Sequence, residues 1–173
     1  MASGLVIIDT GGTMSKTYPR ATLGYAFEMG DEPAATRILR HVSLAREAPR
    51  VVRVCAKDST ELTDEDRAAV AAVISAEKDV QRFVICHGTD TMVETGRFLA
   101  GVCAERQCAA VLVGAKLPEA FKGSDADFNL GFAMAAAQLL PVGHAYIAMN
   151  ATWWRCDLVE RDEATGMWRD AKQ

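Results

Sequence analysis

FVICHGTDTMVETGRFL, residues 83–99, runs from an apolar segment through a polar turn into a helical pattern. The unbroken apolar start predicts a strand that is covered on both faces, as strands of parallel sheets are. The apolar side chains that follow recur at helical spacing, which predicts a helix with one buried face. A strand joined to a helix by a short turn is the building unit of a parallel α/β sheet.

The same unit recurs along the rest of the chain. Apolar runs predict five strands, at residues 5–9, 51–56, 83–88, 109–114 and 145–150. Helical spacing predicts three helices, at residues 63–77, 91–104 and 127–140, the first with Thr63 as its N-cap. The alternation predicts an α/β protein with a doubly wound, mainly parallel sheet and helices on both faces.

Composition favours a globular protein and excludes several classes of function. The 173 residues fit a single domain over 1–173; half are hydrophobic, 24% are charged, and the net charge is −4. This mild negative charge offers no basic surface for nucleic acid. No apolar run approaches the roughly 20 residues that a membrane-spanning helix needs. The start, MASGLVIIDT, lacks the basic residues and cleavage site of a secretory signal, so we expect a cytoplasmic protein.

The five cysteines are scattered and odd in number, at positions 55, 86, 103, 108 and 156. Together with the missing secretion signal, this pattern predicts free thiols and no disulfide framework. The cysteine spacings match no common zinc site, and the chain has only three histidines, so we expect no bound metal.

Polar residues follow four of the five predicted strands. They lie in DTGGT (9–13), KDSTELT (57–63), HGTDT (87–91) and GAKLPEAFKGSD (114–125). The carboxyl ends of parallel strands share one edge of the sheet, and ligands bind there in this architecture. The sequence therefore predicts a single site that is assembled from four turns far apart in the chain.

The turn HGTDT carries more polar groups than a helix start requires. Thr91 and Glu94 have the spacing of a capping box, which leaves Thr89 and Asp90 without a structural task. Thr13 follows two glycines, whose backbone can approach a ligand closely. A threonine hydroxyl needs a base to become a nucleophile, and Asp90 acting with a lysine would serve. The alternative is that these side chains only shape turns or cap helices.

The turn DTGGTM also invites a comparison with dinucleotide-binding loops. It lacks the G-x-G-x-x-G spacing, and no acidic residue clearly ends a second strand about twenty positions later. We therefore reject the dinucleotide interpretation.

Four segments resemble the successive signature blocks of bacterial L-asparaginases. They are IIDTGGTMSKTY, KDSTELTDEDR, ICHGTDTMVETGRFL and VGAKLPEAFKGSDADFNLGFA, in the order and at the spacing of that family's N-terminal domain. The resemblance extends from about residue 4 to residue 150, and the length is similar to short-chain members that consist of this domain alone. It implies a flavodoxin-like fold and an amidohydrolase that converts L-asparagine to L-aspartate and ammonia without cofactor or metal.

The resemblance implies a threonine nucleophile and an acyl-enzyme. Thr13 matches the nucleophile's position. Tyr18 matches its partner, in an irregular segment over residues 14–30 that we interpret as a mobile lid, and Tyr25 is the other candidate.

A second catalytic group follows from the same resemblance. Thr89, Asp90 and a lysine are expected to relay protons or to activate water. We expect Lys122 to provide the lysine, or failing that Lys116. Which threonine attacks first stays open.

The resemblance also implies positions that bind the substrate. Ser59, Thr60 and Asp90 match positions that hold the α-carboxylate and the α-amino group, and the backbone of Gly88 and Ala115 matches positions that cradle the reacting amide. The full expected set is Gly12, Asp58, Ser59, Thr60, Gly88, Ala115 and Lys116.

Two further hypotheses stay open. A related amidohydrolase would act on glutamine or on another amide, and a non-catalytic module would bind an amino acid without hydrolysing it. Members of the family associate as dimers and tetramers, so we expect a homodimer or homotetramer. We expect L-asparagine as the ligand, and neither nucleic acid nor membrane as a partner.

Overall fold

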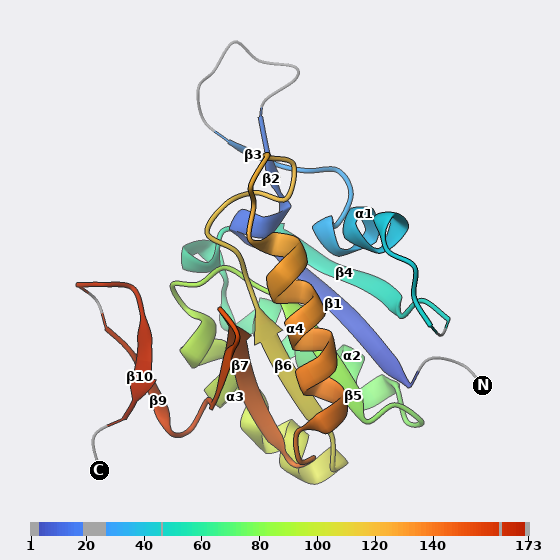
Figure 1. The fold of residues 1–173 in the computed structure, drawn as a ribbon. Coiled ribbons are helices and arrows are strands. Elements are labelled where there is room, and N and C mark those ends of the chain that lie inside the picture. Colours follow the sequence, from blue (N-terminus) through green and yellow to red (C-terminus); the bar gives the residue numbers. More distant parts are fainter. Residues whose placement is uncertain (1–3, 19–26, 46, 163, 172–173) are drawn as a thin grey trace.

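The computed structural model describes residues 4–18, 27–45, 47–162 and 164–171. Strands of the central sheet follow the order β4–β1–β5–β6–β7–β8 (Figure 1). Their bounds are β1 Leu5–Gly11, β4 Arg50–Lys57, β5 Arg82–Cys86, β6 Ala109–Val113, β7 His144–Met149 and β8 Thr152–Arg155. The first five correspond to the five strands that the sequence predicts.

Parallel pairing runs through the sheet as far as β7. Strand β1 pairs in parallel with both β4 and β5, whereas β8 is an antiparallel edge strand. Counted in chain order, this is the 2-1-3-4-5 arrangement of flavodoxin-like folds with one strand added. The direction of winding changes between β1 and β5, and ligands in such folds bind above the carboxyl ends of those strands. The predicted doubly wound sheet is confirmed.

Helices cover both faces of this sheet. Figure 1 shows α4 (Ala126–Leu139) in front of the strands, and α2 (Asp64–Ala76) and α3 (Met92–Arg106) behind them. These three match the predicted helices, and a fourth, α1 (Ala34–His41), lies beside α4 and was not predicted. No helix in the described part of the chain is long and apolar enough to cross a membrane.

The two predicted helix caps have different outcomes. Thr63 caps α2, because its hydroxyl accepts the Asp66 N–H and the Asp66 carboxylate accepts the Thr63 N–H in return. Thr91 is the N-cap residue of α3, but the predicted capping box is wrong, because the Thr91 side chain makes no capping hydrogen bond. Its hydroxyl donates to the Ser59 carbonyl at 2.7 Å, since the fold brings that acceptor within reach. The turn that precedes α3 is therefore bound to the turn that follows β4.

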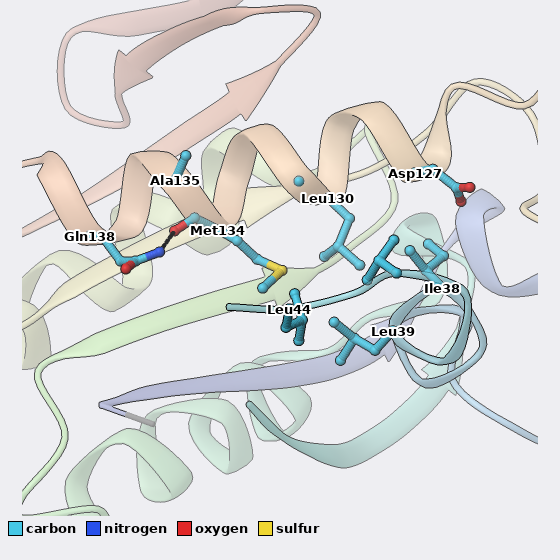
Figure 2. A pocket seen from close by; sticks show the side chains of 10 residues that line it. Ile38, Leu39, Leu44, Asp127, Leu130, Met134, Ala135 and Gln138 are labelled. Carbon is cyan, nitrogen blue, oxygen red and sulfur yellow. Dashed lines mark hydrogen bonds between the residues drawn. The ribbon is translucent and has the colours of Figure 1, made fainter. Parts of the chain in front are cut away.

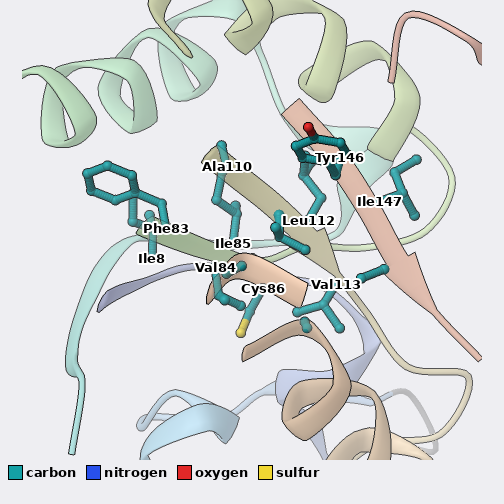
Figure 3. Close-up of a cluster of buried hydrophobic side chains, with 14 of the residues drawn as sticks. Ile8, Phe83, Val84, Ile85, Cys86, Ala110, Leu112, Val113, Tyr146 and Ile147 are labelled. Carbon is teal, nitrogen blue, oxygen red and sulfur yellow. The ribbon is translucent and has the colours of Figure 1, made fainter. Parts of the chain in front are cut away.

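The core is centred on the middle strands (Figure 3). Phe83, Val84 and Ile85 of β5 are completely buried, and so are Leu112 and Val113 of β6. Helices cover both faces of these strands, so a polar side chain would lose water there without gaining a partner. This explains why the strands are continuously apolar in sequence.

A short ribbon rises from the carboxyl end of β1. It consists of β2 (Lys16–Thr17) and β3 (Glu28–Met29), which pair antiparallel (Figure 1). The sequence predicts an irregular lid over residues 14–30, and the ribbon gives part of that segment regular structure. Residues 19–26, including the candidate Tyr25, lie outside the described part of the chain.

The C-terminal segment packs on its own chain. After β8 it forms a hairpin of β9 (Val159–Arg161) and β10 (Trp168–Asp170). Arg97 of α3 donates to the carbonyl oxygens of Cys156 and Val159, at 3.2 and 2.9 Å. These bonds fasten the start of the hairpin to α3, so a segment without a clear sequence period has a defined place in the fold.

Candidate active site

The turns after β1, β4 and β5 pack directly against one another. Gly12 lies so close to the His87–Gly88 peptide that a Cβ on Gly12 would lie 2.7 Å from the Gly88 Cα. The Gly12 N–H donates to the Lys57 carbonyl at 2.9 Å, which joins the first turn to the second. The Gly12 φ of 72° and ψ of −179° belong to a region that is essentially restricted to glycine. Glycine is therefore required where these turns meet.

Gly88 is the centre of the arrangement. A Cβ on Gly88 would lie 2.7 Å from both Cβ and Oγ of Ser59, so the third turn touches the second. A Cβ on Gly114 would lie 2.6 Å from the His87 carbonyl oxygen and 3.2 Å from Thr89 Cγ2, which places the fourth turn beside the third. The four turns that the sequence predicts to converge are in contact with one another.

Asp125 shapes the fourth turn. Its carboxylate accepts the N–H groups of Lys116 and of the following residue, each at 3.0 Å. The Asn129 side-chain amide donates to the Gly114 carbonyl at 3.2 Å. Ala115 is buried, whereas Lys116 is exposed. The turn is therefore held by polar side chains from the start of α4, and the Ala115 backbone lies on the inner side.

Thr13 follows Gly12 and begins a short 3-10 turn. Its side chain is half-buried, and its hydroxyl makes no hydrogen bond with any described residue. Behind it, the Ser15 hydroxyl donates to the buried Asp9 carboxylate at 3.1 Å, and Arg53 pairs with Asp9 at 2.7 Å. Burial raises the pKa of Asp9, and the hydrogen bond from Arg53 opposes that rise. This pair, in which Asp9 is buried and Arg53 is partly exposed, lies at the base of the Thr13 turn.

Asp90 pairs with a residue that the sequence did not indicate. Its Oδ1 lies 2.8 Å from Nη2 of Arg161, on β9. The Asp90 side chain is 49% exposed and the Arg161 side chain 27%, so the pair lies at the rim of the site. The predicted lysines, Lys122 and Lys116, are both exposed, and neither forms an ion pair within the described ranges. The cation that the structure places on Asp90 is therefore an arginine from the C-terminal hairpin.

Asp58 and Ser59 are in different surroundings although they are adjacent. Lys16 Nζ lies 2.5 Å from one Asp58 oxygen, and the Thr60 N–H and hydroxyl donate to the other. The hydrogen bond from Lys16 lowers the pKa of Asp58. Asp58 thus joins the first two turns and presents no free carboxylate. The Ser59 Oγ is buried and has no hydrogen-bond partner among the described residues, which is unfavourable unless a ligand or water binds it.

Tyr18, the expected partner of Thr13, belongs to an aromatic cluster. Its ring centroid lies 5.6 Å from that of Phe27 and 6.1 Å from that of Phe121. The Tyr18 side chain is 55% exposed, and no hydrogen bond joins its hydroxyl to Thr13. Because Phe121 belongs to the fourth turn, the cluster connects the ribbon to that turn.

Two cavities lie away from the meeting point of the turns. Figure 2 shows an apolar groove between α1 and α4, with Ile38, Leu130 and Met134 among its lining residues and none from the four turns. A second cavity of about 540 Å³ lies beside the β2–β3 ribbon, and Tyr18 and Glu119 line part of it. Among the described residues, no group of three or more His, Cys, Asp or Glu side chains is arranged to hold a metal ion.

The fold and the site together define the class of protein. A flavodoxin-like sheet that gathers hydroxyl and carboxylate groups above its switch point is an α/β protein with a polar site for a small ligand. Residues 4–167 match the family model described as the asparaginase N-terminal domain. This chain therefore belongs to the asparaginase family.

Curated relatives are similar to part of the chain. L-asparaginase 1 of Escherichia coli K12 is 31% identical over 110 residues, which are 63% of this chain and 32% of that protein. L-asparaginase of Thermococcus kodakarensis is 30% identical over 138 residues, 78% of this chain and 40% of that protein. A probable periplasmic L-asparaginase of Haemophilus influenzae is 30% identical over 139 residues, 77% and 38% of the two chains. The chain thus spans about a third to two fifths of the length of these relatives.

Solved structures share the fold. The thermostable L-asparaginase of Thermococcus kodakarensis superposes with a TM-score of 0.79 at 21% identity, over 96% of this chain and 50% of that one. L-asparaginase I of Vibrio cholerae gives a TM-score of 0.78 at 21% identity, over 98% and 51%. The chain corresponds in fold to about half of each structure.

Proposed function

We propose that this chain hydrolyses L-asparagine to L-aspartate and ammonia, with a threonine as nucleophile. The proposal is carried by the contact of the four polar turns around Gly88, which brings the Thr13 turn against the turn that holds Thr89 and Asp90. Membership of the asparaginase family and the names of the relatives support this substrate. In this proposal residues 1–173 act as a single catalytic domain.

Thr13 is the proposed nucleophile. Its Oγ attacks the side-chain amide carbon and its proton passes to a base. The Gly12 N–H is already bound to the Lys57 carbonyl, so the proposed oxyanion donor of this turn is the Thr13 N–H, an effect of roughly 3 kcal/mol per donor. The C–N bond breaks, the nitrogen takes up a proton and leaves as ammonia, and an aspartyl ester remains on Thr13. Water then hydrolyses the ester. Tyr18 is the proposed partner of Thr13, which requires its hydroxyl to approach when substrate is bound.

Thr89 and Asp90 form the proposed proton-transfer group, and we assign its cation to Arg161. The support is the 2.8 Å ion pair between Arg161 and Asp90. An arginine keeps its proton at physiological pH, so it supplies a fixed positive charge while the carboxylate accepts and returns the proton. The exposed Lys122 and Lys116 are the alternative candidates for the cation that acts with Asp90. In a second order of events, Thr89 attacks the amide before Thr13.

The proposed binding positions suit a small zwitterion. Asp90 accepts hydrogen bonds from the ammonium group, and the Ser59 hydroxyl donates to the α-carboxylate. The Thr60 hydroxyl joins it only if substrate draws its proton away from Asp58, which accepts it in the structure. The buried Ser59 Oγ, which lacks a partner within the described ranges, supports this assignment. The remaining proposed positions frame the pocket or face the amide with their backbone: Gly12, Asp58, Gly88, Ala115 and Lys116.

Ammonia release from L-asparagine and L-glutamine, measured side by side on the purified chain, tests the proposal. We expect faster release from asparagine, unaffected by EDTA and abolished in Thr13→Ala and Asp90→Ala. Asp79→Ala, which removes an exposed carboxylate in a turn away from the site, is the matched control. Faster release from glutamine would correct the substrate. Aspartate binding in calorimetry without ammonia from either amide would indicate a non-catalytic module and overturn the proposal.

We also propose a cytoplasmic location and a homodimer or homotetramer. The five cysteines are free, which suits a reducing compartment. One structural neighbour, with a TM-score of 0.70, is described as a probable cytoplasmic L-asparaginase from Campylobacter jejuni, whereas the Haemophilus relative is named periplasmic. Light scattering on the eluted protein checks the assembly, and a monomer at working concentration would refute it.

A further inference from the structure

A chain of buried polar groups lies behind the third turn. The His87 imidazole is completely buried, with Nδ1 2.6 Å from the Gly88 carbonyl oxygen and Nε2 2.8 Å from the Thr95 hydroxyl. The Arg67 Nε–H donates to the same hydroxyl at 3.1 Å. Side chains from α2, α3 and the end of β5 thus form a continuous path that ends on the backbone of the site.

The carbonyl end of this path sets the direction of its hydrogen bonds. A carbonyl only accepts, so His87 Nδ1 carries the proton that is donated to Gly88. In the neutral ring Nε2 then has a lone pair, which accepts the proton of the Thr95 hydroxyl. The Thr95 oxygen in turn accepts from the Arg67 guanidinium, which only donates. The neutral tautomer with the proton on Nδ1 therefore satisfies every group of the path.

The bond to Gly88 determines how the next peptide is turned. The carbonyl and the N–H of a trans peptide point in opposite directions, and no described peptide is cis. Because His87 holds the Gly88 carbonyl toward the interior, the Thr89 N–H points to the opposite side, away from the buried imidazole. That N–H has no hydrogen-bond partner among the described residues.

A glycine at this point makes such a restraint necessary. Ser59 leaves no room for a side chain at Gly88, since a Cβ there would lie 2.7 Å from its Oγ. A glycine peptide reorients more readily than any other, so the backbone by itself does not fix the carbonyl. The His87 imidazole therefore fixes the orientation of the Gly88 carbonyl, which no side chain at Gly88 can do.

We infer that His87 is a positioning residue for the proposed hydrolysis: its Nδ1–H fixes the Gly88–Thr89 peptide so that the Thr89 N–H faces an anionic oxygen of the bound amino acid. The inference rests on the proposed function. Burial lowers the pKa of His87 to about 4, and the nearby Arg67 cation acts in the same direction, so the ring is neutral at neutral pH.

Two substitutions test separately the two hydrogen bonds that the His87 imidazole makes. In His87→Asn the amide nitrogen lies near the position of Nδ1 and keeps the bond to Gly88. In His87→Gln the amide reaches the position of Nε2 and keeps the bond to Thr95. We expect both variants to lose similar unfolding free energy. We expect kcat/KM to fall about 100-fold in His87→Gln, as a misplaced peptide would cause. His87→Asn should lose less than about fivefold. Equal losses in the two variants would overturn the inference.

The imidazole nitrogen signals of wild type, measured by 15N NMR at neutral pH, test the geometry without activity. We expect the spectrum to show a proton on Nδ1 and none on Nε2. If the enzyme is fully active and the proton lies on Nε2 alone, the inference is overturned. If wild type releases no ammonia, the proposed function fails and L-aspartate calorimetry decides instead. Weaker binding in His87→Gln than in His87→Asn would then support positioning, and equal binding would overturn it.

Discussion

Replacing Gly12 with alanine tests whether the turns are packed as tightly as the geometry indicates. The new Cβ would lie 2.7 Å from the Gly88 Cα and still closer to the Gly88 nitrogen, and ordinary contact begins at 3.4 Å, so the two turns must separate by more than about 0.7 Å. The nearest atoms belong to the backbone, so no side chain can rotate out of the way.

The expected losses follow from this geometry. A non-glycine residue with these dihedral angles costs about 1–3 kcal/mol, and the overlap adds roughly 1–3 kcal/mol of unfolding free energy. A displacement of the order of 1 Å in a catalytic arrangement costs about 100-fold in rate. We therefore expect Gly12→Ala to be strongly destabilised and to release ammonia about 100-fold more slowly.

Gly101→Ala is the matched control. Gly101 lies in α3, no atom lies within 4 Å of the point where a Cβ would be added, and its φ is not positive, so the change should stabilise the chain by about 0.5–1 kcal/mol with unchanged turnover. Urea unfolding and coupled ammonia assays measure both quantities. A Gly12→Ala variant with wild-type stability and turnover would refute the close packing of the turns.

Three further predictions concern other parts of the site. Arg161→Ala should slow turnover about 100-fold whereas Lys122→Ala should not, and the reverse order in the ammonia assay would return the cationic role to Lys122. His87 has a pKa of about 4 when folded against 6.5 in its ordinary state, so the unfolded chain binds more protons between those values. The unfolding free energy should fall by up to about 3 kcal/mol from pH 6.5 to 4, and a slope in urea titrations equal to that of His87→Asn would contradict this. Thr91→Val, which removes the bond to the Ser59 carbonyl, should lose about 1 kcal/mol and raise KM, while Thr91→Ser stays near wild type; equal stability of the two variants would exclude the contact.

The sheet and its main helices could be predicted because burial on two sides leaves a strong sequence signal. Strands such as Arg82–Cys86 are apolar without interruption, and a helix such as Asp64–Ala76 starts at a cap that is visible in sequence. Helix α1 was not predicted because it has only eight residues, too few for its spacing to repeat along the sequence, although its apolar and charged side chains separate clearly onto two faces.

The convergence of the turns could also be predicted, since parallel strands bring their carboxyl ends to one edge. Individual partners could not, because they depend on contacts across the fold. Thr91 has the spacing of a cap, yet a carbonyl 32 positions earlier in the chain accepts its proton. Arg161 lies in a charge-rich tail without a period, and only the hairpin's attachment to α3 brings it to Asp90. The opposite charges of Asp90 and Arg161 were the one sequence signal that could have suggested this ion pair.

The central claim is that the four turns form one pocket for an amino acid, and a crystal structure of the chain soaked with L-aspartate tests it most directly. We expect the side-chain carboxylate within hydrogen-bonding distance of Thr13 Oγ, the ammonium group on Asp90, and the α-carboxylate at Ser59. Aspartate bound in the α1–α4 groove, with the space between Thr13 and Asp90 empty of it, would contradict the account.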